Sequence, residues 1–252
     1  MHRFFVNHIK EKKGEDVSLD SLRHQLKNVL RFRKDDFIEI FDDTSFEYSI
    51  RILDDNCDFG EIISKRIRKI EMYPEIILCQ SFIKNDRFEL ILEKSSELGV
   101  TQIIPMITER VQSGSKLKNF DSKHSRWRKI IQEAVEQSGG NVIPTIESFH
   151  TFKDLLNLFD DQYEKILFWE KFENSIDLKT CLNSYQNNIK KLIIFIGPVG
   201  GFSESEVSIA RENRCKIVTL GDRVLKSETV AISSLSIIRY HFQGLVSGKY
   251  KN

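Results

Sequence analysis

The apolar residues of this chain change their periodicity near residue 70. Before that point, short apolar runs predict strands at residues 2–6, 37–41, 46–53 and 61–70. One stretch shows helical spacing instead, and its apolar positions are Leu19, Leu22, Leu26, Val29 and Leu30. Pro74 follows the last run, and proline interrupts strand pairing. The pattern therefore predicts a small β-rich domain over residues 1–72.

Between residues 73 and 252, apolar runs alternate with helical patterns. The runs predict strands at residues 75–81, 102–107, 165–169, 191–196 and 216–220. Local signals mark the intervening helices: a D-x-x-E box at Asp86 and Glu89, a stop at Gly99, and a capping box formed by Ser203 and Glu206. Alternating strands and helices are typical of a parallel sheet covered by helices, so the predicted fold class is α/β.

The last helical pattern is amphipathic, with its apolar positions spaced alternately by four and three residues. Those positions are Ala231, Leu235, Ile238, Phe242 and Leu245. An apolar face of this kind must be buried, either against the sheet of the same chain or against a second subunit. Spacing alone does not separate the two.

Two glycine-marked turns stand out in this second stretch, IGPVGGF at residues 196–202 and LGDRVLKSETVA at residues 220–231. Each follows a predicted strand and precedes a helix, and loops at the carboxyl ends of parallel strands suggest one ligand pocket. Neither turn matches a phosphate-binding glycine loop. The connection after the first strand also lacks the glycines of a dinucleotide site, which disfavours a nicotinamide-dependent oxidoreductase.

Charge is unevenly distributed although the net charge is only +1. Residues Asp35 to Glu61 include ten acidic residues and one basic residue, whereas Arg110 to Lys129 include seven basic residues and one acidic residue. The basic stretch could bind nucleic acid, and its alternative interpretation is a solvated helix face.

The four cysteines are scattered without a C-x-x-C pair, so we expect neither a metal site nor disulfides. The amino terminus lacks the apolar core of a signal peptide, and no apolar run reaches the length of a membrane span. We therefore expect a soluble, cytoplasmic protein.

Six segments, in order, closely resemble the bacterial family of small-subunit ribosomal RNA uracil-N3 methyltransferases, within the SPOUT class. They are HRFFV at 2–6, VLRFRKDD at 29–36, KNDRFELILEKSSELGVTQIIPMITER at 84–110, RWRKIIQEAVEQSG at 126–139, IGPVGGFSESE at 196–206 and LGDRVLKSETVAI at 220–232. The resemblance implies a PUA-like β-barrel RNA-binding domain over residues 1–72. It also implies a SPOUT methyltransferase domain over residues 73–252, with a C-terminal trefoil knot.

The activity that this resemblance implies is methylation of N3 of a uridine in small-subunit (16S) ribosomal RNA. The cofactor would be S-adenosyl-L-methionine. The substrate would be naked RNA or RNA within an assembled 30S particle. The family pairs as a homodimer, which would cover the apolar face of the last helix. Neither a metal nor a membrane is implied.

Site residues follow from the same resemblance. Cofactor binding is expected at Gly197, Pro198, Gly200, Gly201, Leu220, Gly221, Leu225, Lys226 and Thr229. Uracil acquires negative charge on its ring oxygens when N3 loses its proton, and Lys226 and Arg87 would meet that charge. Glu228 would either accept the proton or orient one of these cations. RNA contacts are expected from Arg3, Arg31, Arg33, Lys116, Lys118, Lys123 and Arg126. Phe4 and Phe5 belong either to the barrel core or to the RNA-facing set.

This chain departs from the family pattern at three places. Val199 stands where the family usually has Glu, Gly140 where an Arg is common, and Lys226-Ser227 where Arg-Thr is usual. Lysine keeps the charge of arginine but loses its planar fork. These departures motivate an alternative, a ribosome-binding or assembly factor that keeps the fold but has lost turnover.

Overall fold

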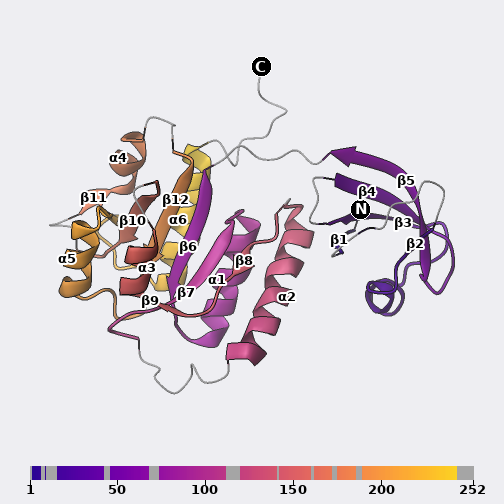
Figure 1. Cartoon of the computed structure of the whole chain (residues 1–252), viewed down its shortest axis with the longest axis horizontal. Helices are drawn as coiled ribbons and strands as arrows, with labels where there is room; N and C mark the ends of the chain where they lie inside the picture. Colours follow the sequence, from indigo (N-terminus) through magenta and orange to yellow (C-terminus); the bar gives the residue numbers. More distant parts are fainter. Residues whose placement is uncertain are drawn as a thin grey trace. The chain divides into compact units, whose positions relative to one another are not determined.

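The structure is a computed structural model, and it describes residues 2–6, 9, 16–42, 46–67, 74–111, 120–140, 142–159, 162–171, 175–185 and 189–242. The chain divides into two compact units, drawn in Figure 1. The first unit comprises Met1–Ile70 with Val135–Val142, and the second comprises Glu71–Ala134 with Ile143–Asn252. The end of a long helix in the second half of the sequence thus belongs to the first unit, which no local pattern indicated.

A five-stranded sheet forms the first unit. Its strands are β1 (Arg3–Phe5), β2 (Val17–Ser18), β3 (Phe37–Phe41), β4 (Phe46–Ile52) and β5 (Phe59–Ile67). They lie in the order β1-β3-β4-β5-β2, and only β1 and β3 pair in parallel among the described strands of this sheet. Phe4, Ile38, Ile40 and Ile50 belong to its buried core, which places Phe4 in the interior.

The helical segment of the first unit is shorter than the apolar spacing predicted. It is a π-type helix, η1 (His24–Val29), in which the Leu30 N–H donates to the Gln25 carbonyl. Leu26 is fully buried, but Val29 is 61% exposed, so the apolar positions at helical spacing do not all share one buried face. The wider π turn rotates side chains out of the i, i+3, i+4 register on which the prediction depended.

The second unit is built on a parallel sheet, which confirms the α/β prediction. Its strands are β6 (Glu75–Ser81), β7 (Gln102–Ile107), β8 (Thr145–Ile146), β9 (His150–Thr151), β10 (Glu164–Phe168), β11 (Ile176–Asp177), β12 (Lys191–Ile196) and β13 (Lys216–Thr219). The order is β11-β13-β10-β12-β6-β7-β8, with β9 also paired to β7, and every pairing is parallel.

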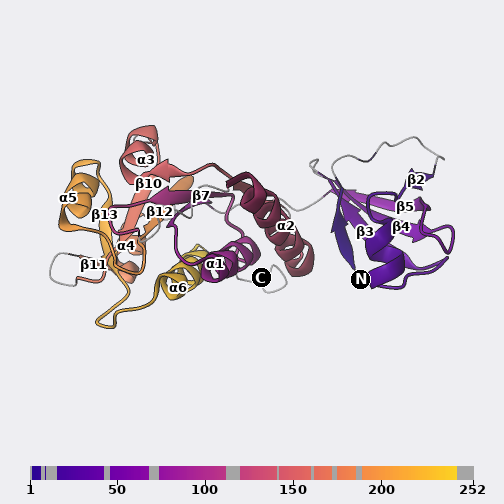
Figure 2. The same cartoon turned by 90° about the horizontal axis from the view of Figure 1, so that it is seen from below.

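Helices cover both faces of this sheet (Figures 1 and 2). Alternate residues of β12 show why: Leu192 and Ile194 belong to one buried cluster, whereas Ile193 and Phe195 belong to another. The first cluster includes α1 (Asn85–Glu97), α2 (Phe120–Ser138), α4 (Leu178–Asn183) and α6 (Ser227–His241). The second includes α3 (Phe152–Leu158) and α5 (Glu204–Glu212). Within the described chain, no helix is long and apolar enough to cross a membrane.

Helix boundaries confirm some of the predicted signals and contradict one. Ser203 and Glu206 form the capping box of α5, and Gly99 follows α1 with a φ of 75°. The D-x-x-E box was wrong, because the N-cap of α1 is Lys84, two residues before Asp86. Glu89 instead accepts a hydrogen bond from the Asn85 side chain at 2.7 Å.

Helix α6 resolves the question of its apolar face for the described part of the helix. Ala231, Leu235 and Ile238 are fully buried in the cluster that also contains α1 and the sheet. In both cartoon views α6 lies beside α1 (Figures 1 and 2). This part of the face is therefore covered by the same chain, while Leu245 lies outside the described residues.

Candidate active site

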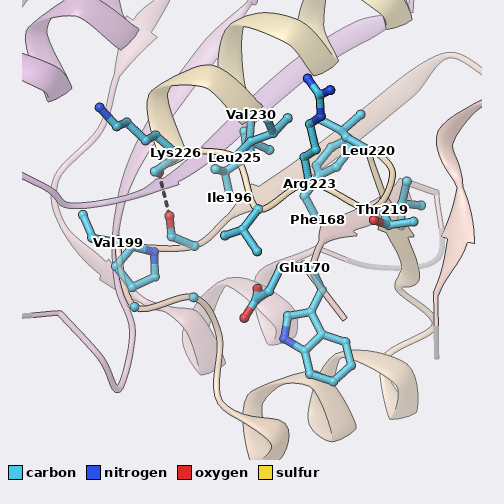
Figure 3. Close-up of a pocket in the computed structure, with 18 of the residues that line it drawn as sticks. Phe168, Glu170, Ile196, Val199, Thr219, Leu220, Arg223, Leu225, Lys226 and Val230 are labelled. Carbon is cyan, nitrogen blue, oxygen red and sulfur yellow. Dashed lines mark hydrogen bonds between the residues drawn. The ribbon is translucent and has the colours of Figure 1, made fainter. Parts of the chain in front are cut away.

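A cavity of about 290 Å³ lies at the carboxyl ends of β10, β12 and β13 (Figure 3). These three strands are neighbours in the sheet, so the segments that follow them meet at one edge. Both glycine turns contribute to the lining. The lining residues are Arg87, Phe168, Trp169, Glu170, Ile196, Gly197, Pro198, Val199, Gly200, Gly201, Val218, Thr219, Leu220, Arg223, Val224, Leu225, Lys226, Ser227 and Val230.

A buried hydroxyl joins the two turns. The Ser227 hydroxyl donates to the Gly197 carbonyl at 2.7 Å, shown as the dashed line in Figure 3. The same hydroxyl accepts from the side-chain amide of Gln80 at 3.0 Å, and Gln80 is completely buried at the end of β6. Serine thus supplies the hydrogen-bonding group that threonine would supply, so this departure from the family pattern leaves the contact in place.

The first turn adopts a backbone that requires glycine. Gly201 has a φ of 66°, and its N–H donates to the Pro198 carbonyl at 3.0 Å. The Arg110 guanidinium donates to the Gly200 carbonyl at 2.9 Å, which ties the segment after β7 to the turn. Val199 lines the cavity with 68% of its surface exposed.

Most of the expected cofactor-binding residues line the cavity, but two do not. Gly221 has a φ of 107°, and its N–H donates to the Thr219 hydroxyl at 3.3 Å. Thr229 is exposed in the first turn of α6. Both lie outside the lining set, so their cofactor contacts stay predictions.

No sequence motif marks the cavity wall that the end of β10 supplies. Phe168, Trp169 and Glu170 line the cavity there. The apolar run at residues 165–169 predicts β10, but the position of this strand between β12 and β13 depends on tertiary structure. The indole N–H of Trp169 is buried and has no hydrogen-bond partner among the described residues.

The three residues expected to be catalytic lie close to the cavity. Arg87 and Lys226 line it. Glu228 is not among the lining residues, but its Oε1 lies 3.5 Å from Nη1 of Arg87. Its side chain is 14% exposed, and Oε2 is buried with no hydrogen-bond partner in the described part of the chain. The packing of α1 against α6 brings Arg87 and Glu228 together from positions far apart in sequence.

The residues expected to bind RNA have different surroundings. Arg31 and Arg33 are exposed in the first unit, whereas the Arg3 side chain is 8% exposed and paired with Glu47 at 2.5 Å. In the second unit, exposed Arg126 pairs with Glu89 at 2.7 Å, and the Lys123 ammonium lies 5.0 Å from the centre of the Phe82 ring. Lys116 and Lys118 lie outside the described residues.

Glu47 has a perturbed acidity because of its surroundings. Burial raises the pKa of this carboxyl, but hydrogen bonds and charge from Arg3 and Arg66 outweigh that effect and hold the pKa below its usual value. The Arg3 guanidinium also lies 3.9 Å from the centre of the Phe41 ring. An RNA contact by Arg3 stays a prediction. Phe5 stacks edge-on against Phe41 and is partly buried.

The second unit is an α/β domain of the ligand-binding type. Its parallel sheet has a cavity between two glycine turns at the carboxyl edge. A family model described as an RNA methyltransferase domain matches residues 71–239, and the chain belongs to this family. No group of potential metal ligands occurs in the part of the chain that the structure describes.

Individual relatives match nearly the whole chain. It is 31% identical over 237 residues to the Ribosomal RNA small subunit methyltransferase E of Mesomycoplasma hyopneumoniae, covering 94% of this chain and 98% of that protein. The crystal structure of a protein of the same name from Neisseria gonorrhoeae, bound to S-adenosyl methionine, is similar with a TM-score of 0.83. The two chains are 28% identical, and the match covers 95% of this chain and 97% of that one. A putative methyltransferase from Legionella pneumophila, also in complex with the cofactor, is 28% identical with a TM-score of 0.82, covering 94% and 96%.

Proposed function

We propose that this protein transfers a methyl group from S-adenosylmethionine to N3 of a uridine in small-subunit ribosomal RNA. The observation that carries the proposal is the cavity between the two glycine turns, with Arg87 and Lys226 in its lining. The small-subunit ribosomal RNA methyltransferases to which the chain is similar support the substrate, and two similar structures with bound cofactor support the methyl donor.

The cavity has the properties that such a cofactor needs. Its walls include apolar side chains for the adenine ring, among them Ile196, Leu220 and Leu225. Gly200 and Gly201 let main-chain groups approach a ligand without a side chain between them. The cofactor supplies an electrophilic methyl group on a sulfonium. The chain contributes the positions of the reactants, which accounts for about 7–11 kcal/mol in well-oriented reactions.

The charged residues at the cavity have a role in preparing uracil for attack. Loss of the N3 proton places negative charge on the two flanking carbonyl oxygens. Arg87 and Lys226 would stabilise that charge, because both are cations that line the cavity. Of the two roles that the sequence left open for Glu228, its position fits the orienting one: Oε1 holds Arg87, while the residue itself lies outside the cavity lining. Acceptance of the N3 proton by Glu228 stays a prediction, because Oε2 is buried away from the cavity lining.

The remaining parts of the proposal concern fold and assembly. We propose a PUA-like barrel in residues 1–72, a trefoil knot in residues 73–252 and a homodimer, as the family resemblance implies. The likeness to the Neisseria structure over 95% of the chain supports the first two. RNA would contact exposed Arg31, Arg33 and Arg126, and ribosomal RNA as the substrate accords with the expected cytoplasmic location. Sedimentation of the purified protein measures the dimer.

Nucleoside mass spectrometry tests the activity. Small-subunit RNA from a deletion strain should lack one 3-methyluridine, and purified protein with labelled S-adenosylmethionine should restore it. Naked RNA and assembled subunits, compared in parallel, identify the form of the substrate. An unchanged uridine methylation pattern in the deletion strain would refute the enzymatic proposal. If the protein then still bound small subunits, the assembly-factor alternative would stand.

A further inference from the structure

Glu170 is the one acidic side chain among the described residues that line the cavity. It follows β10, is exposed to the cavity and solvent, and has no hydrogen bond or ion pair with another described residue. Figure 3 shows its carboxylate directed toward the first glycine turn. Because Glu170 is exposed and has no partner in the described protein, its carboxylate is available to a ligand that enters the cavity.

Gly201 leaves the space that this carboxylate occupies. A Cβ atom at position 201 would lie 2.8 Å from Oε1 and 2.9 Å from Oε2 of Glu170, closer than real Cβ contacts allow. The φ of 66° already requires glycine at this position, and the missing side chain also lets the Glu170 carboxylate lie against the turn. This arrangement places two acceptor oxygens against the main chain of the turn expected to bind the cofactor.

Glu170 does not serve to neutralise an anionic ligand, because a carboxylate would repel one and cations are already present in the lining. The other charged lining residues, Arg87, Arg223 and Lys226, are all cations. A carboxylate accepts hydrogen bonds at both oxygens and donates none when ionised. Its natural partner in a cavity for a nucleoside is a vicinal diol, which presents two hydroxyl donors side by side. Acidic side chains recognise ribose in this way at dinucleotide sites.

The order of the strands indicates which part of the cofactor lies beside Glu170. Arg87 follows β6 and Glu170 follows β10, with β12 between them. Two steps between neighbouring strands separate the ends of β6 and β10 by roughly 9–10 Å. Methyl transfer is proposed to occur beside Arg87, so the nucleoside end of the cofactor extends toward β10. Its ribose is the group that reaches Glu170.

We infer that the Glu170 carboxylate binds the ribose hydroxyls of the cofactor, in the space that Gly201 leaves open. This inference rests on the proposed function and deepens it by assigning a cofactor-binding residue. The carboxylate lies against the turn from one side, and the apolar walls hold the adenine from the other. Hydrogen bonds to the ribose hydroxyls do not depend on the positive charge on sulfur, so they form equally with S-adenosylmethionine and S-adenosylhomocysteine.

Calorimetric titration of the full-length protein tests the inference with three probes: S-adenosylmethionine, S-adenosylhomocysteine and the 2′,3′-dideoxyribose analogue of S-adenosylhomocysteine, which lacks both hydroxyls. Glu170→Gln and Glu170→Ala should weaken binding of the first two by the same factor, roughly ten- to hundredfold for the loss of charge-assisted hydrogen bonds. The dideoxy analogue should bind weakly to the natural protein and lose little more in Glu170→Ala. Glu212→Gln, an exposed glutamate of α5, is the matched control.

Three outcomes would overturn the inference. Unchanged affinity in Glu170→Ala would remove the residue from the site. A loss confined to S-adenosylmethionine would show that the carboxylate meets the sulfonium charge rather than the ribose. If Glu170→Ala lowered the affinity for the dideoxy analogue as much as the affinity for S-adenosylhomocysteine, Glu170 would act only on the shape of the pocket. If the natural protein failed to bind S-adenosylmethionine at all, the proposed function itself would fail, which is a distinguishable result.

Discussion

Replacing Arg239 with methionine should strongly destabilise the second unit. Arg239 lies near the end of α6 and is only 4% exposed. Its guanidinium donates to the Leu98 carbonyl at 3.0 Å, to the Pro74 carbonyl at 3.2 Å and to the Gly99 carbonyl. It therefore joins the last helix to the carboxyl end of α1 and to the residue before β6.

The size of the effect follows from the acceptors that lose their donor. Each buried carbonyl left without a partner costs about 1–3 kcal/mol. Removing the desolvated guanidinium offsets part of the sum over these three carbonyls. Because Arg239→Met removes the charge and leaves only neutral carbonyls without a donor, we expect a net loss of about 3–5 kcal/mol. Such a loss is a large share of the 5–15 kcal/mol by which native proteins are typically stable.

Urea unfolding followed by tryptophan fluorescence measures this loss in the second unit, because Trp127 and Trp169, the chain's two tryptophans, belong to it. Arg239→Lys should lie between the natural protein and Arg239→Met, since an ammonium keeps the charge but lacks the planar fork of donors. Arg128→Met, an exposed arginine of α2, is the control and should change stability by no more than about 0.5 kcal/mol. A loss under about 1 kcal/mol in Arg239→Met would refute the assigned role.

Three further predictions concern the site and the first unit. Lys226→Ala should lower methylation at least about a hundredfold while leaving the unfolding midpoint unchanged, and Lys226→Arg should retain turnover; near-normal rates in the alanine variant would remove Lys226 from catalysis. Ser227→Ala should weaken binding of S-adenosylmethionine about tenfold by freeing the first glycine turn, whereas Ser227→Thr should bind normally in the same calorimetric titration. The ion pairs of Glu47 with Arg3 and Arg66 lower its folded pKa, so their contribution is present above the unfolded value of 4.5 and is lost as pH falls through the folded pKa. Acid unfolding of the first unit can be monitored by circular dichroism. Below pH 4.5, Glu47→Gln should therefore lose structure less steeply with falling pH than the natural protein does, and identical profiles would contradict this reasoning.

Local patterns in the sequence were sufficient for much of the second unit. Apolar runs predicted β6, β7 and β12 with the bounds that the structure has. The capping box at Ser203 and the stop at Gly99 also occur as predicted. Strand periodicity, helix caps and glycine turns depend on neighbouring residues, so a single sequence contains enough information to recognise them.

The same local reasoning was insufficient where a competing arrangement was available. The apolar spacing around Val29 indicated an ordinary helix, but the chain forms a short π-type helix that leaves Val29 exposed. Asp86 and Glu89 matched the pattern of a helix start, yet α1 begins at Asn85, and Glu89 bonds to side chains instead. A motif of four residues does not specify where the preceding strand ends and its helix begins.

By itself, the sequence determined the α/β class, the positions of the two glycine turns and, through family resemblance, the candidate residues Arg87, Lys226 and Glu228. Only the tertiary structure decided that Glu228 pairs with Arg87 and that Glu170 lines the cavity. The physical reason is that both depend on the packing of elements distant in sequence: α1 against α6 in one case, and β10 between β12 and β13 in the other. Periodicity defines which face of an element is buried, but the order in which strands pair is set by contacts among all of them at once.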